Sequence, residues 1–503
     1  MKRAYFHTFG CKLNFAETSS VAALMAESGV TRIEEGETPD YVVVNTCSVT
    51  EEADKKCRQA IRSFHRRWPQ AAILVTGCFA QLKPSDVAAL PGVKLVAGND
   101  RKTLIAEYVR KSVENQAATE RDKLPGSDTR PGSGCENHSR PGNESEPGSG
   151  CESQLSECQV IASKDIRSFT PSCSRGDRTR CFLKVQDGCD CWCSYCTIPA
   201  ARGRSRSGSA ESIVAQARQA AAEGAKEIVI TGVNIGDFGR RTADETGELA
   251  GHPRETFLDL IRRLDRVEGI ERYRISSIEP DLLTDEIISF CAESQRFMPH
   301  FHIPLQSGSD AVLRLMRRRY DTALFRDKIL KIKEAMPDAF IGIDLIVGAR
   351  GETLEEFERS KEFISSLPIT RLHIFPYSER PGTRALEIEH VVSQTEKHRR
   401  VGEMIALSES KMREFAAPFA GTVRPVLLEH GREGEPMSGY TDNYLKVSVI
   451  APAELDNQIV MVRLESPQVS HMGDISFTGS LAAASDGLAA GSAGPALPPQ
   501  DEK

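Results

Sequence analysis

The 503-residue sequence contains no run of eighteen apolar residues, so no membrane-spanning helix is expected. Its first residues, MKRAYFH, lack the apolar stretch and cleavage site of a signal peptide, and we therefore expect a cytoplasmic protein. There is no excess of positive charge either: the net charge of −7 argues against a uniformly basic nucleic-acid binder. The remaining composition, 40% hydrophobic and 27% charged, is typical of soluble globular proteins, and the length allows three domains.

The sequence contains 14 cysteines. In a reducing compartment, clustered cysteines more often serve metals or redox chemistry than structural disulfides. Two short basic runs, Arg314–Arg319 and Lys397–Arg400, could bind phosphate locally, although each could equally be a solvated helix face.

Two stretches have the composition of unfolded chain. Residues 114–172 are rich in Pro, Gly, Ser, Asn and Glu, and the sequence PGSGCE at 131–136 returns at 147–152. Residues 482–503 are rich in Ala, Gly, Ser and Pro. Such segments bury too little apolar surface to offset their chain entropy. We expect a flexible linker and a disordered tail that separate three folded parts.

The first folded part, residues 1–113, alternates apolar runs with helical patterns such as Glu17–Ser28 and Glu51–Arg67. This alternation predicts a doubly wound α/β domain. Its expected parallel strands are Ala4–Thr8, Tyr41–Asn45 and Ala72–Thr76. A cysteine follows each of these strands, namely Cys11, Cys47 and Cys78. Ligands of such sheets gather outside the carboxyl ends of the strands, so the three thiols could converge.

The second part, residues 173–405, repeats the alternation about six times and predicts a closed or partial parallel (β/α) barrel. Its expected strands are Phe182–Asp187, Glu227–Val233, Arg272–Ile278, His300–Leu305, Ile341–Val347 and Arg371–Pro376. The third part, residues 418–481, has short β-branched runs that predict a small antiparallel β-barrel or sandwich. These runs are Val423–His430, Tyr444–Ile450 and Ile459–Leu464.

Four thiols lie within eight residues directly after the first barrel strand. Cys189, Cys193 and Cys196 have the spacing Cys-x3-Cys-x2-Cys, with Cys191 interleaved. Thiolates hold iron–sulfur clusters, and three ligands leave one iron open for a substrate. Structural zinc is the alternative, but it normally uses paired Cys-x2-Cys knuckles. The spacing therefore favours a 4Fe-4S cluster.

This spacing, with Tyr195 before the last cysteine, resembles the radical S-adenosylmethionine (radical SAM) superfamily. The resemblance implies that the cluster binds S-adenosylmethionine and cleaves it to a 5′-deoxyadenosyl radical, the protein positioning the cofactor. Segments after later strands match as well: Thr231–Gly236, Ser276–Pro280 and His302–Ser309. They imply cofactor contacts from Gly232, Asn234, Glu279 and Gln306. Gly348–Glu352 departs from the pattern, since it lacks a Phe-Pro pair before Gly-Glu.

The cysteine motifs of the first part are similar to those of the methylthiotransferase N-terminal domain. They are Thr8–Asn14, Asn45–Thr50 and Thr76–Gln81. The resemblance implies that Cys11, Cys47 and Cys78 hold a second 4Fe-4S cluster, which takes part in sulfur delivery. The other cysteines lack such a context: Cys191 is expected to be a spectator, Cys57 core or surface, and Cys173, Cys181 and Cys291 structural.

The third part resembles a TRAM domain, a small RNA-binding β-barrel, in the stretches Gly421–Glu429 and Gly439–Tyr444. Tyr440 and Tyr444 are expected to stack on bases, and Arg424 and Lys446 to meet phosphates. Ordinary packing within the barrel is the alternative reading of these side chains.

Within the methylthiotransferases, Cys11–Asn14 and Phe375–Thr383 are closest to the enzymes that act on threonylcarbamoyladenosine in tRNA. The resemblance implies that a methylthio group replaces C2–H of adenosine-37 beside the anticodon. Its partners would be the tRNA anticodon loop and an electron donor such as flavodoxin or ferredoxin. Isopentenyladenosine or a ribosomal protein as substrate, and a non-catalytic zinc protein that binds RNA, remain open. The sequence indicates no oligomeric state.

Overall fold

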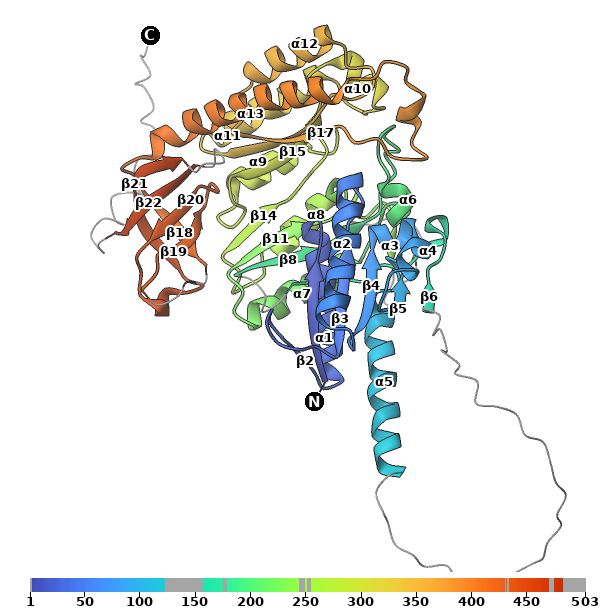
Figure 1. Cartoon of the computed structure of the whole chain (residues 1–503). Helices are drawn as coiled ribbons and strands as arrows, with labels where there is room; N and C mark the ends of the chain where they lie inside the picture. The colour runs from blue at the N-terminus through green and yellow to red at the C-terminus, as the bar shows by residue number, and fades with distance from the viewer. Residues whose placement is uncertain are drawn as a thin grey trace, which may run out of the picture.

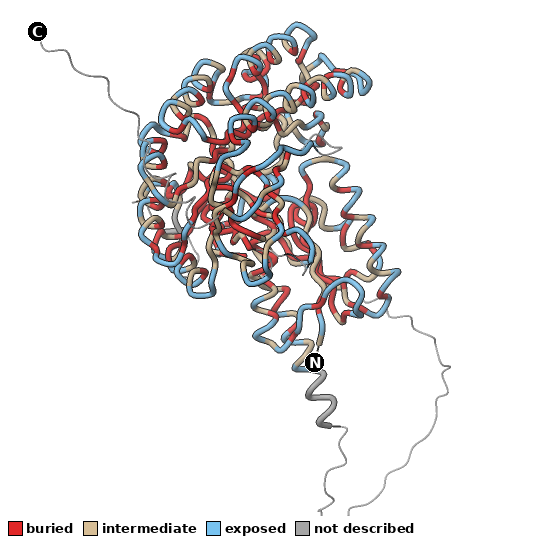
Figure 2. Tube along the Cα trace, turned by 90° about the vertical axis from the view of Figure 1, so that its left-hand side faces the viewer, coloured by how far each residue is buried: buried red, intermediate tan, exposed pale blue. Residues whose placement is uncertain are grey.

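The computed structural model describes residues 2–122, 157–174, 179–243, 249–250, 255–429, 431, 434–469 and 475–482. Side chains at 116–122, 242–243 and 249–250 are not described. Three units follow one another along the chain, an N-terminal sheet domain, a central parallel barrel and a C-terminal small barrel (Figure 1). The buried residues concentrate in the middle of the molecule, inside the outer helices (Figure 2). No helix in the described ranges is both long and apolar enough to cross a bilayer.

The N-terminal domain is built on one six-stranded sheet in the order β2-β1-β3-β4-β5-β6, with every neighbouring pair parallel. Its strands are β1 (Lys2–Thr8), β2 (Val30–Arg32), β3 (Tyr41–Thr46), β4 (Ala72–Gly77), β5 (Val93–Ala97) and β6 (Glu157–Gln159). The chain steps from β1 out to β2 and then returns to the other side of β1. This reversal makes the crevice between the ends of β1 and β3 the expected ligand site of the sheet.

Helices cover both faces of this sheet, as the strand–helix alternation predicted. One face packs against α1 (Lys12–Glu27) and α5 (Thr103–Asp122). The other packs against α2 (Glu51–Arg67), α3 (Cys78–Leu82) and α4 (Pro84–Ala88). The start of α2 is fixed by Thr50, whose side chain accepts a hydrogen bond from the Ala53 amide.

The expected linker at 114–172 is wrong at both ends. Helix α5 continues to Asp122, because residues 114–122 are largely good helix formers. Strand β6 joins the sheet through main-chain pairing with β5, which needs no apolar pattern. It is followed by η1 (Ser163–Asp165) and β7 (Ser172–Cys173). Residues 123–156, with Cys135 and Cys151, lie outside the described residues, as does the expected tail apart from Ala482.

The central unit is a six-stranded, parallel partial barrel, as predicted. Its strands are β8 (Arg180–Lys184), β11 (Glu227–Thr231), β14 (Arg272–Ile275), β15 (His300–Gln306), β16 (Phe340–Val347) and β17 (Arg371–Pro376). A bridge between Ser277 and His302 joins β14 to β15. The outer helices are α7 (Ala210–Ala222), α8 (Phe257–Leu264), α9 (Asp285–Glu293), α10 (Asp310–Leu315), α11 (Thr322–Ala335) and α12 (Leu354–Ser365).

Short elements complete the central unit. They are β9 (Gln186–Asp187), α6 (Ile198–Arg202), β10 (Arg206–Ser207), η2 (Ile235–Asp237), β12 (Thr242–Ala243), β13 (Leu249–Ala250) and η3 (Arg384–Glu387). Helix α1 of the N-terminal domain packs directly on this unit, because Phe15 and Ala16 contact Phe182 on β8 and Val229 on β11. The first cysteine loop is thereby held against the barrel.

The C-terminal unit is a closed five-stranded barrel in the order β18-β19-β20-β22-β21. Its strands are β18 (Val423–Leu428), β19 (Met437–Thr441), β20 (Lys446–Val449), β21 (Ile459–Val469) and β22 (Ile475–Leu481), with η5 (Ala453–Leu455) between β20 and β21. Helix α13 (Gln394–Ala416) and η4 (Ala417–Phe419) lead into it. Phe340 at the start of β16 packs into its core, so the small barrel is seated against the central one.

Candidate active site

The loop from Gly188 to Thr197, between β9 and α6, carries Cys189, Cys193 and Cys196. Gly188 has φ +70°, and a Cβ there would lie 2.1 Å from the Arg204 carbonyl oxygen, so only glycine fits this turn. Each of the three sulfurs accepts an N–H group: the Cys191 amide donates to Cys189 at 3.4 Å, the Ile198 amide to Cys196 at 3.4 Å, and Arg318 to Cys193 at 3.1 Å. Hydrogen bonds to the ligand sulfurs are a means by which proteins tune iron–sulfur clusters.

Arg318 is a site residue that the sequence patterns did not single out. Its side chain is 4% exposed and forms an ion pair with Glu279 as well as the hydrogen bond to Cys193. Burial raises the pKa of Glu279, and Arg318 opposes that shift. The basic run Arg314–Arg319 is therefore neither a phosphate patch nor a solvated face at this position. The run alone could not reveal it, because the partner residues come from β14 and the cysteine loop.

Two of the predicted cofactor contacts, Gly232 and Asn234, are held by Gln186. The Gln186 side chain accepts from the Val233 amide at 3.0 Å and the Asn234 amide at 2.8 Å. A Cβ on Gly232 would lie 3.1 Å from the same Gln186 oxygen, so the close approach requires glycine. Asn234 Nδ2 donates to Cys191 at 3.7 Å, while its Oδ1 is buried without a hydrogen-bond partner.

An unsatisfied buried acceptor beside the cysteine loop is consistent with a ligand that donates hydrogen bonds, such as the ammonium of S-adenosylmethionine. The Ser276 hydroxyl is likewise buried without a partner. Of the other two residues predicted to contact the cofactor, Glu279 forms an ion pair with Arg318. The other, Gln306, is the last residue of β15 and has a backbone φ of +67°. Such a backbone conformation is uncommon for a non-glycine residue and clusters at functional sites.

Cys11, Cys47 and Cys78 follow β1, β3 and β4, whose ends are adjacent in the sheet. Gly10 allows two of the loops to meet, since a Cβ there would lie 3.0 Å from Cys47 Cβ and 3.1 Å from its sulfur. Asn14 fixes the same pair of loops, because its side chain donates to the Phe9 carbonyl at 2.7 Å and the Thr46 carbonyl at 3.2 Å.

Burial raises the pKa of thiols in both cysteine sets. Burial raises the pKa of Cys47 to about 11, and the neighbouring Cys78 and Cys11 add to the shift. Burial likewise raises the pKa of Cys196 to about 12. Thiols with such pKa values stay protonated at neutral pH unless a metal replaces the proton. Among the described residues, no three Cys, His, Asp or Glu side chains converge as the ligands of one ion do. A 4Fe-4S cluster binds each thiolate through a different iron, and its ligands stand further apart.

A buried set of charges joins the two cysteine sites. Arg202, at the end of α6, donates to Glu17 at 3.1 Å, Asp187 at 3.0 Å and Asn14 at 2.6 Å. Lys102 and Lys184 also pair with Glu17, Lys184 at 2.8 Å. Burial would raise the pKa of Glu17, but Arg202, Lys102 and Lys184 hold it below its usual value. The network fixes the first cysteine loop relative to the helix that follows Cys196.

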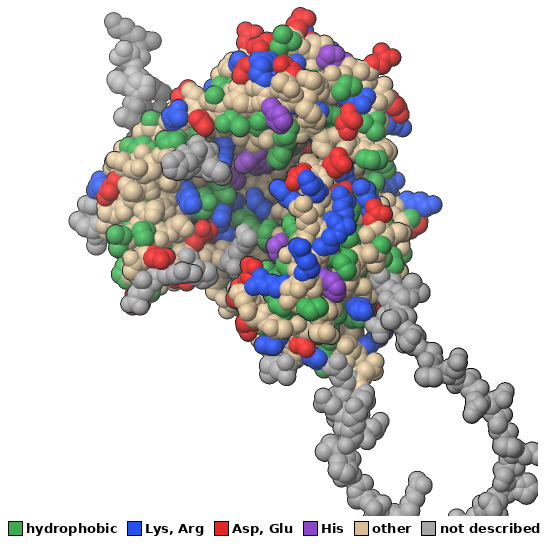
Figure 3. All heavy atoms as spheres, in the orientation of Figure 1, with side chains coloured by type: hydrophobic (Ala, Val, Ile, Leu, Met, Phe, Trp, Pro, Cys, Tyr) green, Lys and Arg blue, Asp and Glu red, His purple; other side chains and the backbone are tan. Residues whose placement is uncertain are grey.

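A cavity of about 830 Å³ lies between the three units. Figure 3 shows this hollow, with Lys, Arg and His side chains inside it. The N-terminal domain contributes Cys11 and Lys12, and the small barrel contributes Tyr440, Tyr444 and Lys446. Inward-facing residues of the central strands form the rest of its wall, among them Phe182, Val229, Arg274, Ser276, His302, Asp344 and His373.

Two of the cavity histidines, His300 and His373, do not supply its positive charge at neutral pH. Burial lowers the pKa of His373 to about 4 and also lowers that of His300. His302 is held in a chain of hydrogen bonds, with Nε2 3.0 Å from Asp344 and Nδ1 2.6 Å from the Ser277 hydroxyl. The cations of the wall are instead Lys12, Arg180, Arg274, Arg371 and Lys446, against the single carboxylate of Asp344.

The predicted RNA contacts divide into two groups. Tyr440 and Tyr444 stack on each other with ring centroids 4.8 Å apart, and Arg180 lies over Tyr440 at 4.4 Å. Both tyrosines and the exposed Lys446 line the cavity. Arg424 does not, because its guanidinium pairs with Asp442 at 2.7 Å and Asp338 at 2.9 Å. Arg424 therefore links the small barrel to Asp338 of the central unit, and its contact with a phosphate stays a prediction.

The remaining described cysteines have mostly structural surroundings. Cys57 and Cys291 are buried in hydrophobic cores, and Cys173 and Cys181 are bonded to each other across β7 and β8. Cys158 is exposed on β6. The segment Gly348–Glu352, whose sequence departs from the radical SAM pattern, is packed beside the cysteine loop. Ala349 belongs to a small apolar cluster against which Tyr195 of that loop packs.

Glu352 gives a prediction for pH dependence. Its carboxylate accepts hydrogen bonds from the Gly348 and Ala349 amides and forms an ion pair with buried Arg400 at 3.4 Å. The basic run Lys397–Arg400 is therefore not a solvated face at Arg400. Burial outweighs Arg400 and raises the pKa of Glu352 to about 7. Between the pKa of Glu352 in the unfolded chain and its folded value of about 7, the folded state keeps a proton that the unfolded state has lost. The free energy of unfolding therefore falls by about 3 kcal/mol as the pH rises through this range.

Urea unfolding from pH 4.5 to 8 would measure this loss, and Glu352→Gln should flatten the slope. An unchanged slope in the variant would contradict the assignment. Glu358→Gln is the matched control, because Glu358 is an exposed carboxylate on α12, the helix that follows.

Known protein families and curated proteins resemble this chain over most of its length. The chain matches Uncharacterized protein family UPF0004 over residues 3–98 and the Radical SAM superfamily over residues 183–364. It is 37% identical to threonylcarbamoyladenosine tRNA methylthiotransferase MtaB of Bacillus subtilis, over 92% of this chain and 94% of that protein. The enzyme of that name from Thermotoga maritima is 33% identical, over 89% and 91%.

The tRNA-2-methylthio-N(6)-dimethylallyladenosine synthase of Geobacter sulfurreducens is 31% identical, over 94% of this chain and 97% of that protein. The threonylcarbamoyladenosine enzymes and the dimethylallyladenosine enzymes therefore both align along nearly the whole chain. The identity is higher to the threonylcarbamoyladenosine enzyme of Bacillus subtilis. The chain belongs to the radical SAM tRNA methylthiotransferase family, whose enzymes use S-adenosylmethionine and two 4Fe-4S clusters.

Proposed function

We propose that this enzyme adds a methylthio group to C2 of N6-threonylcarbamoyladenosine at position 37, beside the tRNA anticodon. One observation carries the proposal: a single cavity is bounded by Cys11, by the strand ends beside the radical cysteine loop, and by Tyr440, Tyr444 and Lys446. A base that enters this cavity meets Cys11 and the strand ends beside the radical cysteine loop while its RNA rests on the small barrel. The 37% identity to the Bacillus subtilis enzyme supports the same substrate.

The reaction requires a base that leaves its stack. The C2–H group of adenine is not acidic enough for acid–base chemistry, and a base that stays in its stack cannot enter the cavity. Single-stranded RNA loops present splayed bases that stack on aromatic side chains, and enzymes that modify bases take them into a closed pocket. Tyr440 and Tyr444 at the wall of the cavity are positioned for such stacking.

When bound, S-adenosylmethionine and a cluster held by Cys189, Cys193 and Cys196 would supply the carbon radical, and a cluster held by Cys11, Cys47 and Cys78 would take part in delivering sulfur. The chain's own residues orient and enclose the reactants. Gln186 holds the loop of Gly232 and Asn234, and Arg318 supports Cys193. Asp344 and Ser277 fix the orientation of the His302 ring in the cavity wall.

Nucleoside analysis tests the substrate. Anaerobically reconstituted enzyme would be given anticodon stem-loops that carry threonylcarbamoyl- or dimethylallyladenosine, with S-adenosylmethionine, a sulfur source and a reductant. We expect the methylthio product, identified by mass spectrometry, from the first RNA only. A methylthio product from the dimethylallyl RNA alone would assign the enzyme to the other branch. A tRNA substrate also places the enzyme in the cytoplasm.

Lys446 should contribute to RNA affinity through a phosphate. It is exposed at the start of β20 and lines the cavity beside Tyr440. Lys446→Gln is expected to weaken stem-loop binding by about 3- to 10-fold and to reduce the slope of log affinity against log salt by about 1. Fluorescence anisotropy at several salt concentrations would measure both. Lys331→Gln, on α11 outside the cavity, serves as control, and an unchanged slope for Lys446→Gln would refute the phosphate contact.

An electron donor such as flavodoxin or ferredoxin would approach the radical cysteine loop from outside. Trp192 lies within this loop and is 59% exposed, and the exposed Arg204 is nearby through its ion pair with Asp190 at 3.2 Å. An exposed aromatic with adjacent positive charge suits an acidic redox protein.

A further inference from the structure

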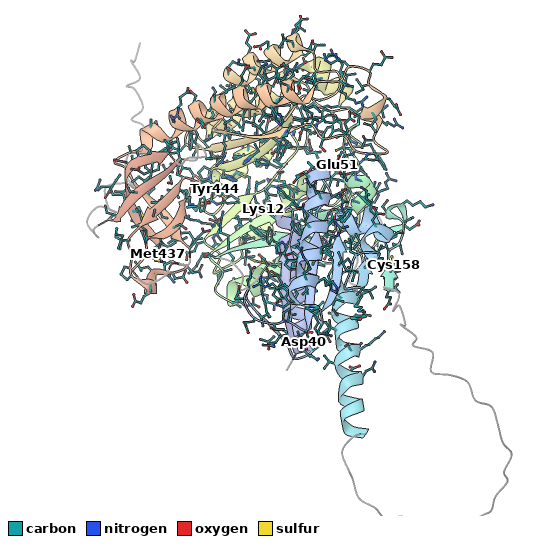
Figure 4. The ribbon with its side chains drawn as sticks, in the orientation of Figure 1. Lys12, Asp40, Glu51, Cys158, Met437 and Tyr444 are labelled. Atoms are coloured by element: carbon teal, nitrogen blue, oxygen red, sulfur yellow. A yellow bond between two sulfur atoms is a disulfide. The ribbon has the colours of Figure 1, made fainter. Side chains whose placement is uncertain are left out.

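Lys12 is a cation whose ammonium has no partner within the part of the chain that the structure describes. It is the first residue of α1, directly after Cys11, and it is half-buried in the wall of the central cavity. No hydrogen bond or ion pair links its ammonium to another described residue. Figure 4 places it beside Tyr444, at the centre of the molecule. Lys12, Arg180 and Tyr444 line the same cavity, and although burial would raise the pKa of Tyr444, Arg180 and Lys12 hold it below its usual value.

Two other cations of the cavity wall form ion pairs with carboxylates that do not line the cavity. Arg180 pairs with Glu429 at 2.9 Å, and Arg274 pairs with Glu227 at 2.9 Å and donates to two main-chain carbonyls of the small barrel. The single carboxylate of the wall, Asp344, is engaged by His302. Lys12 is thus a cation inside the cavity without a counter-ion, and a partly buried charge is normally paired. The site is complementary to an anionic group on the ligand.

The position of Lys12 indicates which part of the substrate it meets. C2 and the N6 substituent of adenine both flank N1, on one edge of the ring. A residue that reads the N6 substituent must therefore lie close to the group that delivers sulfur to C2. Lys12 satisfies this condition, because its neighbour Cys11 is one of the proposed ligands of the sulfur-delivering cluster.

We infer that the Lys12 ammonium binds the carboxylate of the threonylcarbamoyl group and determines the specificity of the enzyme for this substituent. The inference rests on the proposed function. A threonylcarbamoyl group ends in a carboxylate that can compensate the ammonium, whereas a dimethylallyl group is apolar and would leave it unpaired. The specificity therefore comes from one charge pair inside a cavity that otherwise accepts the base and the RNA backbone.

Equilibrium binding to the anaerobically reconstituted holoenzyme tests this role without relying on turnover. Three labelled anticodon stem-loops would be compared, with adenosine, threonylcarbamoyladenosine or its uncharged threoninamide analogue at position 37. We expect the wild type to bind the carboxylate form about 10- to 100-fold more tightly than the amide form, as for hydrogen bonds between charged groups. Lys12→Gln should reduce this ratio to within about twofold, and Lys12→Arg should keep most of it.

Lys55→Gln is the matched control, because Lys55 is an exposed lysine on α2 of the same domain. Iron content and circular dichroism verify that the variants fold and carry their clusters. Equal weakening of all three RNAs by Lys12→Gln would overturn the inference, since the ammonium would then contact a phosphate. A carboxylate preference that survives Lys12→Gln would also overturn it. A fourth stem-loop, with dimethylallyladenosine at position 37, tests the proposed function: tighter binding of this RNA than of the threonylcarbamoyl RNA by the wild type would refute that function.

Discussion

Cys193→Ala is expected to abolish cleavage of S-adenosylmethionine, whereas Cys11→Ala keeps cleavage and loses methylthio transfer. Cys193 lies in the loop beside Gly232 and Asn234, and its sulfur is supported by Arg318. Cys11 lies in the other domain, after β1. The two chemistries therefore depend on separate ligand sets. We expect each activity to fall by more than about 100-fold, as is usual when an essential group is removed.

Chromatography with mass detection would quantify 5′-deoxyadenosine and the methylthio nucleoside after reduction with dithionite. Each variant should also lose roughly half of its iron, since each removes a ligand from one of two similar clusters. Cys158→Ala, an exposed cysteine on β6, should retain both activities and the iron. Formation of 5′-deoxyadenosine by Cys193→Ala would contradict this division.

Arg202→Met is expected to lower the free energy of unfolding by about 3–5 kcal/mol, because it removes one cation and its charge-assisted hydrogen bonds from the buried network, although Lys102 and Lys184 stay paired with Glu17. The Arg202 side chain is 1% exposed and contacts Glu17, Asp187 and Asn14. Methionine fills much of the same volume, so the effect reports the lost charge and hydrogen bonds rather than a cavity. Urea unfolding of the holoenzyme, followed by circular dichroism, measures the change.

Arg204 provides a control two residues away. Its side chain is 60% exposed, and its ion pair with Asp190 is largely solvated, so Arg204→Met should change stability by less than about 1 kcal/mol. Similar losses for Arg202→Met and Arg204→Met would show that the buried network does not hold the two domains together. A loss confined to Arg202→Met would support that role.

The pattern of apolar runs was sufficient for the architecture. Strands of the N-terminal sheet and of the central barrel are buried on both faces, and such runs are visible without any structure. Strands β2, β5 and β6 were missed, and for β2 and β6 the reason is that each has three residues, too few for a period to appear. In the small barrel, β19 contains Gly439, whose missing side chain lets the Leu427 carbonyl approach, and its run therefore does not look like a strand.

Local spacing also gave the cysteine sets, because thiols at strand ends follow from the order of elements along the chain. The roles of charged residues did not follow in this way. Arg318 and Arg400 look like members of solvated basic runs, and only the fold brings Glu279 and Glu352 to them. Arg424 looks like a phosphate ligand in the sequence, and only the fold places Asp442 and Asp338 beside it.

The sequence by itself therefore determined the three units and the two cysteine sets, since periodicity and short spacings are properties of neighbouring residues. Only the tertiary structure decided which charges are paired and which are left for a ligand. Glu17 and Arg202 are 185 residues apart and form a buried pair, whereas Lys12, five residues before Glu17, has no partner within the described residues. Pairing depends on distance in space, because a charge interacts with whatever the fold places within a few ångströms of it.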